Sequence, residues 1–232
     1  MQTLLTNQTR IKVWGTVLIV VMALTACSSS PPVRYYTLQN AARSMSEKSL
    51  SASPEGNATN ILNGNRKPFV LQILPVKIPT TIDLPQLLVR SNDGEVALLE
   101  NNRWVGPLGD EVRSALVSQL TGILKVPEVS SLAIPQDLSI YRLQVDVTRF
   151  DSIRGRYVLQ DTNWSLRQII PTANGDASPS APMLLCATRQ IVQTEDDSTG
   201  ALVRAHQLAL EQLGLQIAEA ANQPPSKWGC GK

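Results

Sequence analysis

Hydrophobic and polar positions divide the chain into a short apolar start, a polar stretch and a long patterned region. The apolar start runs from Val13 to Leu24 and follows two basic residues, Arg10 and Lys12. The polar stretch, 39–67, is rich in Ser, Asn, Ala and Gly and has no apolar periodicity. Such a composition buries too little apolar surface to offset the entropy of ordering, so we expect a flexible loop there.

Several segments have the alternation or the composition of β-strands. They cover residues 33–38, 69–76, 87–90, 95–99, 141–148, 157–170 and 183–194. In 141–148 apolar side chains alternate with polar ones, which predicts a strand with one buried face. Ser91-Asn-Asp-Gly94 separates 87–90 from 95–99 and predicts a hairpin turn between them.

Two segments have the helical period. In 108–124, apolar residues recur at four-residue steps after Pro107, which a first helical turn tolerates. The second helix is expected from Ser198 or Thr199 to about Ala221. The order strands, helix, strands, helix predicts an α+β fold with a mixed, largely antiparallel sheet and two main helices.

The apolar start ends in Leu24-Thr25-Ala26-Cys27, where small side chains precede a cysteine. A basic flank, a short apolar run, small residues and a cysteine are typical of a bacterial lipoprotein signal. We therefore expect cleavage after Ala26, with a diacylglycerol and an N-acyl chain such as palmitate attached to Cys27. The alternatives are a retained membrane anchor, which needs roughly 20 apolar residues, and an ordinary cleaved signal with an incidental cysteine.

These features predict three parts: a lipoprotein signal peptide (1–26), a lipidated N-terminus with a short strand and a flexible polar loop (27–68), and an α+β domain (69–232). Ser28 follows the cysteine, where an aspartate usually keeps a lipoprotein on the inner membrane. We therefore expect the mature protein to be lipid-anchored in the outer membrane, with its domain facing the periplasm.

Charge and cysteine content narrow the class of protein. The formal net charge is +2, and Arg10 and Lys12 account for that excess, so the remainder of the chain is neutral and we expect no nucleic-acid partner. Lipidation of Cys27 leaves Cys186 and Cys230, which an oxidising compartment allows to form a disulfide. The alternative is two unpaired thiols.

The sequence offers no catalytic motif. A phosphate-binding loop and a GxSxG turn are both absent. His206 is the only histidine; it is expected at the border of the apolar side of the last helix, and without partners it predicts no metal site. We expect no catalytic residue and no cofactor apart from the covalent lipid.

Two charged pairs remain open. Asp196 and Asp197 precede a predicted helix, where negative charge is favoured in any case, so a catalytic role for them is not expected. Arg154-Gly155-Arg156 is read as a hairpin with solvated arginines, although it could also contact an acidic group.

Trp104 and Trp164 are the candidate partner-binding residues. Aromatic residues are few in this chain, and tryptophan is enriched at protein contacts. The alternative is that both tryptophans fill the core.

At Trp104 the chain resembles a known family. Asn101-Asn-Arg-Trp-Val-Gly-Pro-Leu108, followed by a Leu-rich helix, resembles the PqiC-type ABC-transport auxiliary lipoproteins. Other matching pieces occur in the family's order: Tyr35-Tyr36-Thr37-Leu38 soon after Cys27, the apolar strand at 69–79, and the Leu84-Pro85 step.

The resemblance implies a non-enzymatic subunit of an ABC/MCE-type lipid transport system. Such a subunit would dock or brace a periplasmic MCE-domain conduit between the inner and outer membranes, with ATP hydrolysis left to the associated inner-membrane transporter. It also suggests a homo-oligomer. The alternatives are a structural lipoprotein that assists an outer-membrane assembly complex and a periplasmic hydrolase that uses paired carboxylates.

Overall fold

The computed structural model describes residues 31–40, 68–91, 94–130, 138–170 and 182–230. The chain divides into a unit over Met1–Pro32 and a unit over Val33–Lys232, and the elements below belong to the second. The signal peptide, Cys27 and nearly all of the polar stretch lie outside the described residues, so the expectations for them stay predictions.

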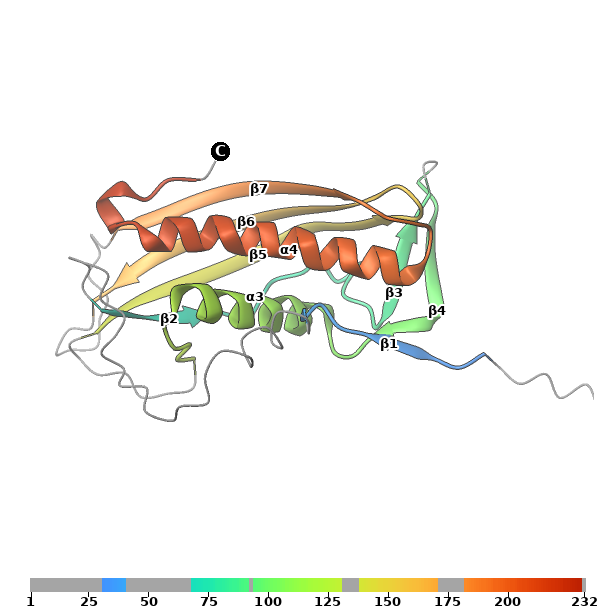
Figure 1. The fold of residues 1–232 in the computed structure, drawn as a ribbon, viewed down its shortest axis with the longest axis horizontal. Helices are drawn as coiled ribbons and strands as arrows, with labels where there is room; N and C mark the ends of the chain where they lie inside the picture. The colour runs from blue at the N-terminus through green and yellow to red at the C-terminus, as the bar shows by residue number, and fades with distance from the viewer. Residues whose placement is uncertain (1–30, 41–67, 92–93, 131–137, 171–181, 231–232) are drawn as a thin grey trace, which may run out of the picture. The chain divides into compact units, whose positions relative to one another are not determined.

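Two sheets and two long helices make up the described unit (Figure 1). The elements are β1 (Arg34–Tyr36), β2 (Phe69–Ile73), β3 (Gln86–Arg90), β4 (Val96–Trp104), α3 (Leu108–Leu124), β5 (Ser139–Ile153), β6 (Tyr157–Ile169), β7 (Met183–Gln193), α4 (Thr199–Asn222) and the short η1 (Pro225–Lys227). The strand orders are β1-β4-β3 and β2-β5-β6-β7. The predicted α+β order is confirmed.

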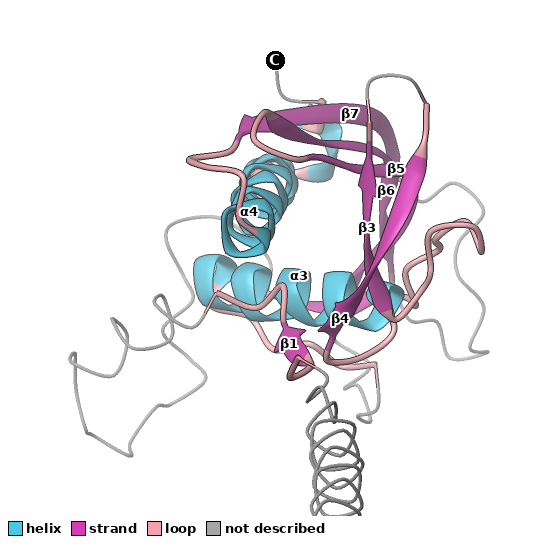
Figure 2. Ribbon diagram, turned by 90° about the vertical axis from the view of Figure 1, so that its right-hand side faces the viewer, coloured by secondary structure: helices cyan, strands magenta, loops and turns pink. Residues whose placement is uncertain are grey.

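Pairing among the described strands is mostly antiparallel, as predicted. The pairs β3–β4, β5–β6 and β6–β7 are antiparallel, whereas β1–β4 and β2–β5 are parallel. Both helices lie on one side of the four-stranded sheet, as the end-on view shows (Figure 2). The main core lies between this sheet and the helices and joins Val145 and Leu166 to Leu116 and Leu213.

The α3 helix has the predicted bounds. Its apolar stripe is buried, Asp110 and Glu111 occupy the positive end of the helix, and Lys125 ends it in the left-handed conformation. In α4, the Ser198 side chain caps the first turn by accepting a hydrogen bond from the Ala201 N–H at 3.1 Å.

The predicted hairpin is confirmed between β3 and β4. Ser91 N–H donates to the Glu95 carbonyl at 2.9 Å, and Gly94 adopts φ 84°, a conformation that disfavours other residues. The β4 strand extends beyond the predicted 95–99 because its far end pairs with β1, where Tyr36 is opposite Trp104.

Three other strand bounds differ from the predictions. The first strand is shorter than 33–38, and β2 ends before the predicted 76. Beyond Ile73 the chain stays beside β5, with the Leu74 N–H donating to the Leu143 carbonyl at 3.0 Å, although prolines interrupt a regular ladder. The β5 strand continues past 148 to Ile153, because its pairing with β6 resumes after a β-bulge.

The bulge in β5 lies between Val147 and Arg149. Val147 faces the core, and the extra residue lets both Thr148 and Arg149 face solvent before Phe150 turns inward again. A bulge re-aims the side chains that follow it. Here it places Arg149 opposite Asp161 on the outer face of the sheet.

Candidate functional site

The strand that follows the predicted lipid anchor is fastened to α3 by Glu111. Its Oε2 accepts a hydrogen bond from the Thr37 hydroxyl at 2.7 Å and another from the Leu38 N–H at 2.9 Å. The Glu111 side chain is buried. A carboxylate withdrawn from water requires such donors, and charge-assisted bonds of this kind are stronger than neutral ones.

The α4 helix fastens the same segment from the other side. Gln207 Nε2 donates to the Thr37 carbonyl at 3.0 Å, and Leu38 is buried in the core. We call Thr37, Leu38, Glu111 and Gln207 the anchor clasp. It fixes the point where the chain enters the folded unit.

A groove of about 290 Å³ lies between α3 and α4 beside the anchor clasp. Its lining is Leu38, Asn40, Ala115, Ser118, Gln119, Gly122, Ile123, Gln207, Leu210 and Glu211. Gln119 Nε2 donates to the Glu211 carbonyl at 2.6 Å and so joins the two helices.

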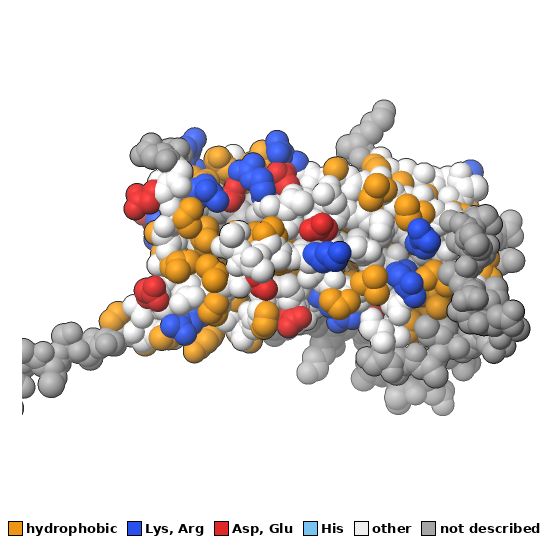
Figure 3. Space-filling view, turned by 180° about the vertical axis from the view of Figure 1, so that it is seen from behind, with side chains coloured by type: hydrophobic (Ala, Val, Ile, Leu, Met, Phe, Trp, Pro, Cys, Tyr) orange, Lys and Arg blue, Asp and Glu red, His pale blue; other side chains and the backbone are white. Residues whose placement is uncertain are grey.

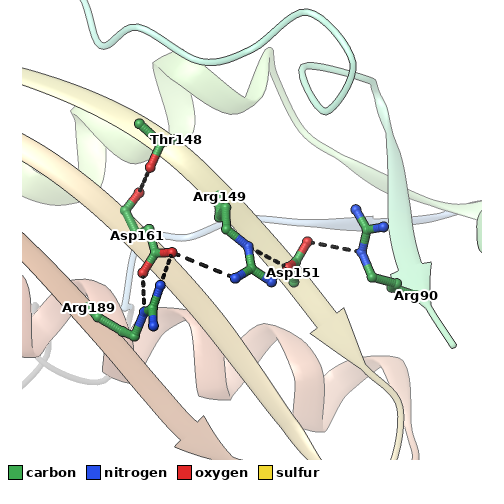
Figure 4. Close-up of polar contacts among 6 residues, drawn as sticks. All are labelled: Arg90, Thr148, Arg149, Asp151, Asp161 and Arg189. Carbon is green, nitrogen blue, oxygen red and sulfur yellow. Dashed lines mark hydrogen bonds and ion pairs between the residues drawn. The ribbon is translucent and has the colours of Figure 1, made fainter. Parts of the chain in front are cut away.

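Alternating charges cross four strands on the outer face of the sheet (Figure 4). Arg90 Nε donates to Asp151 at 3.3 Å, and Arg149 Nε donates to the other oxygen of Asp151 at 3.0 Å. Arg149 also lies 3.8 Å from Asp161, which accepts two bonds from Arg189 at 2.7 and 2.8 Å. We call these five residues the charge ladder.

The ladder favours the ionised form of Asp161. The hydrogen bonds from Arg189 keep the pKa of Asp161 below its ordinary value, and the same contact raises the pKa of Arg189. Asp151 is buried with only 4% of its surface exposed, between two arginines. The ladder therefore joins β3 of one sheet to β5, β6 and β7 of the other.

Arg90 of the charge ladder also lines a second concavity, which we call the arginine hollow. It has a volume of about 360 Å³ and lies between the β3–β4 hairpin and the β5–β6 turn. Its arginines, Arg90, Arg154 and Arg156, surround apolar side chains that include Ile153. Seen from behind, the molecule carries lysine and arginine side chains interspersed with apolar and acidic ones (Figure 3).

His206 lies deeper than the sequence indicated. It is fully buried instead of bordering the apolar side of α4, and its ring stacks on Phe150 at 3.8 Å. Burial lowers its pKa from 6.5 to about 3, so the ring is neutral.

The partners of His206 define its tautomer. Gln160 Nε2 lies 2.9 Å from Nδ1, which therefore accepts, and Nε2 carries the proton that it donates to the Ser152 hydroxyl at 2.9 Å. A general base must accept a hydrogen bond from the hydroxyl of its serine, whereas Nε2 of this ring donates one to Ser152. The hydrogen bond between Ser152 and His206 is buried and joins β5 to α4.

Both candidate tryptophans are buried. Trp104 packs edge-on against Phe150 at 6.1 Å, and Trp164 donates from Nε1 to the Thr188 hydroxyl at 3.0 Å. Their burial favours the alternative that they fill the core, because neither offers appreciable area to a partner. The role of Trp104 and Trp164 as partner-binding residues stays a prediction.

The structure joins Cys186 and Cys230 in a disulfide, with their Cα atoms 5.6 Å apart. Cys186 is on β7, so the bond holds the C-terminal tail against the sheet. Within that tail, Trp228 packs edge-on against Tyr141 at 5.2 Å.

The remaining charged candidates have local structural roles. Asp196 accepts the Ser198 N–H at 2.7 Å, and the side chain and N–H of Ser198 together lower the pKa of Asp196 at the start of α4. Among the described residues, no group of three or more His, Cys, Asp or Glu side chains could hold a metal ion. No helix in the described ranges is long and apolar enough to cross a membrane.

Sequence reasoning missed the anchor clasp, the charge ladder and the arginine hollow. Glu111 falls in the first turn of the helix predicted over 108–124, a position that does not indicate its contacts with Thr37 and Leu38. Arg90 and Asp151 are 61 positions apart. The one available signal was Arg154-Gly155-Arg156, whose arginines do line the hollow.

Comparison with known proteins gives both a family and a fold. A model of the family described as ABC-type transport auxiliary lipoprotein component matches residues 49–218. One uncharacterized protein of known crystal structure has a TM-score of 0.54 at 20% identity, covering 68% of this chain and 97% of its own. Protein XCC0632 from Xanthomonas campestris has a TM-score of 0.47 at 17% identity, covering 66% of this chain and 85% of its own. No curated protein sequence matches the chain.

Proposed function

Because the chain belongs to the family of ABC-type transport auxiliary lipoprotein components, we propose that it is an outer-membrane subunit of an ABC/MCE-type lipid transport system. In this role it docks or braces a periplasmic MCE-domain conduit, and the ATP is hydrolysed by the associated inner-membrane transporter. The lipid on Cys27 anchors the protein, and the folded unit faces the periplasm.

The anchor clasp is the observation that carries this proposal. Arg34 lies seven positions after Cys27, and seven residues span at most about 25 Å. Glu111 and Gln207 prevent the chain from peeling away beyond that point. A lipid on Cys27 therefore keeps the folded unit close to the membrane surface, as a brace requires.

We infer that the role is not enzymatic. Ser152 is buried and its hydroxyl accepts a hydrogen bond from His206, so the ring does not act as its base. Hydrogen bonds from Arg189 lower the pKa of Asp161 in the charge ladder, whereas a general acid requires a raised pKa.

Co-purification tests the proposed function. The full chain is tagged at its C-terminus, membranes are extracted in mild detergent, and partners are identified alongside a Cys27→Ala control. We expect an MCE-domain protein to co-purify with the lipidated protein and to be lost or reduced in the control. Recovery of an outer-membrane barrel protein, or of no partner from well-expressed bait, would overturn the proposal in favour of a structural lipoprotein.

A homo-oligomer is part of the same proposal, because a symmetric MCE assembly would present several equivalent docking sites. Light scattering on the full chain in detergent measures the mass of the assembly. A monomer at high concentration would exclude this part of the proposal.

A further inference from the structure

The arginine hollow is built from two hairpin turns that belong to different sheets. Its lining is Val89, Arg90, Ser91, Glu95, Ala97, Ile153, Arg154 and Arg156. The β3–β4 hairpin supplies the first five, and the β5–β6 turn supplies the last three.

The turn that carries two of the arginines is held in place. Gly155 adopts φ 65°, and the Arg156 N–H donates to the Ile153 carbonyl at 3.0 Å, which closes the turn. Arg154 donates from a guanidinium nitrogen to the Asp197 carbonyl at 3.3 Å. The carbonyl group of Asp197 therefore helps to position the Arg154 guanidinium.

Positive charge predominates at the hollow. Among the described residues that line it, three are arginines and Glu95 is the single acid. Asp151, which binds Arg90, also binds Arg149. Asp197 lies next to Gly155 of the β5–β6 turn. Guanidinium groups prefer phosphate and carboxylate, to which they offer paired donors.

The hollow is also partly apolar. Val89, Ala97 and Ile153 line it together with the arginines; Ala97 is exposed on β4, and Ile153 is 7% exposed. A site for a fully hydrated ion gains nothing from such a lining, whereas a ligand with a carbon body next to its anionic group buries apolar area there.

The hollow lies toward the end of the unit from which the anchored chain departs. Figure 1 shows the start of β1 and the β3–β4 hairpin at the same end of the described unit.

We propose that the arginine hollow binds the phosphate of an anionic phospholipid, with the guanidinium groups of Arg154 and Arg156 on the phosphate and the adjoining glycerol and acyl carbons on Val89, Ala97 and Ile153. The inference rests on the proposed function, because it assigns the class of lipid that the transport subunit meets. Arg90 is the third cation, held in place by the charge ladder.

Calorimetric titration of the full lipidated chain in neutral maltoside micelles tests the proposal. The probes are dihexanoyl phosphatidylglycerol, dihexanoyl phosphatidylcholine and inorganic phosphate, each corrected for heat in protein-free micelles. We expect the anionic lipid to bind more tightly than either of the other probes. We expect the double variant Arg154→Gln/Arg156→Gln to weaken its binding about tenfold, since two charge-assisted contacts are lost.

Two further variants make the result specific. Arg167→Gln removes an arginine from the exposed face of β6 at the other end of the sheet and is expected to bind like the parent protein. Ala97→Glu adds a negative charge at an exposed position inside the hollow and is expected to weaken binding without disturbing the core.

Three results would overturn the inference. Equal binding of the choline lipid would show that charge does not select the ligand, and equal binding of inorganic phosphate would show a simple anion site. Unchanged binding by both hollow variants would place the lipid elsewhere. None of these depends on recovery of an MCE-domain protein, so this inference and the proposed function fail separately.

Discussion

At the residue scale, Glu111 combines a local role with a distant one. It is favoured at the start of α3 by the helix dipole, and its carboxylate also binds Thr37 and Leu38, more than 70 positions earlier. Only the second contact determines where the anchored segment joins the folded unit.

Replacing Glu111 with alanine separates these roles. The buried Leu38 N–H would lose its acceptor, and hydrogen bonds to charged groups contribute about 1.5–3 kcal/mol each. We expect Glu111→Ala to lower the free energy of unfolding by about 3 kcal/mol, measured by chemical denaturation. Asp110→Ala, which removes an exposed acid from the same helical turn, is the matched control; equal losses in the two variants would disprove the clasp.

His206 gives stability a defined dependence on pH. Its pKa is about 3 in the folded protein and 6.5 in the unfolded chain, because burial disfavours the charged ring. Between those values the unfolded chain binds the extra proton, so stability is complete above pH 6.5 and falls as pH decreases toward 3.

The expected slope from this group is about 1.4 kcal/mol per pH unit within that window. Unfolding free energies measured from pH 7 to pH 4 in the parent and in His206→Gln test it. The variant, although less stable, should show the shallower slope, and parallel curves would contradict the assignment. Protonation of Asp161, whose pKa Arg189 holds low, changes the unfolding free energy of the parent and of the variant equally.

At the element scale, the disulfide between Cys186 and Cys230 closes a loop with a sequence separation of 44 that contains α4. Constraining the unfolded chain over such a loop contributes about 4 kcal/mol in the chain-entropy model. We expect dithiothreitol to lower the free energy of unfolding of the parent by an amount of this order.

A Cys230→Ser variant supplies the control for reduction. It should already show the lower stability, and dithiothreitol should have no further effect on it. A parent protein that is equally stable in both redox states would show that the bond adds nothing to the folded state.

Elements with local signals were predictable from the sequence. The apolar stripe of α3 and the turn at 91–94 each depend on residues that are only a few positions apart in the sequence, and both are confirmed. The bulge before Arg149 was not predictable, because Thr148 and Arg149 are both polar and the alternation simply stops. The parallel pairs β1–β4 and β2–β5 join residues about 70 positions apart, which no local pattern records.

The candidate site escaped prediction for the same reason. Within the charge ladder, Asp161 is the cross-strand neighbour of Arg149 and of Arg189, and the register of these strands is set by the buried faces of β5, β6 and β7 and not by the charges themselves. The resemblance at Trp104 did identify the family, although that side chain fills the core. A residue that marks a family by sequence need not be one that meets a partner.

At the scale of the whole molecule, the decisive quantity is the length of chain between the predicted lipid anchor on Cys27 and the fold. The seven positions from Cys27 to Arg34 allow about 25 Å at most. If the arginine hollow meets phospholipid, this short tether supplies a high effective concentration of headgroups.

Lengthening the tether should therefore weaken lipid contact without altering the hollow. An insertion of about 20 Gly and Ser residues after Ser30 adds an r.m.s. distance of about 25 Å. A photo-crosslinking amino acid at position 97 reports phospholipid in the hollow, and the same group at exposed position 167 on β6 reports background. We expect the insertion to reduce lipid labelling at 97 severalfold while labelling at 167 stays low. Equal labelling at 97 with and without the insertion would show that tether length does not govern how the folded unit meets the membrane.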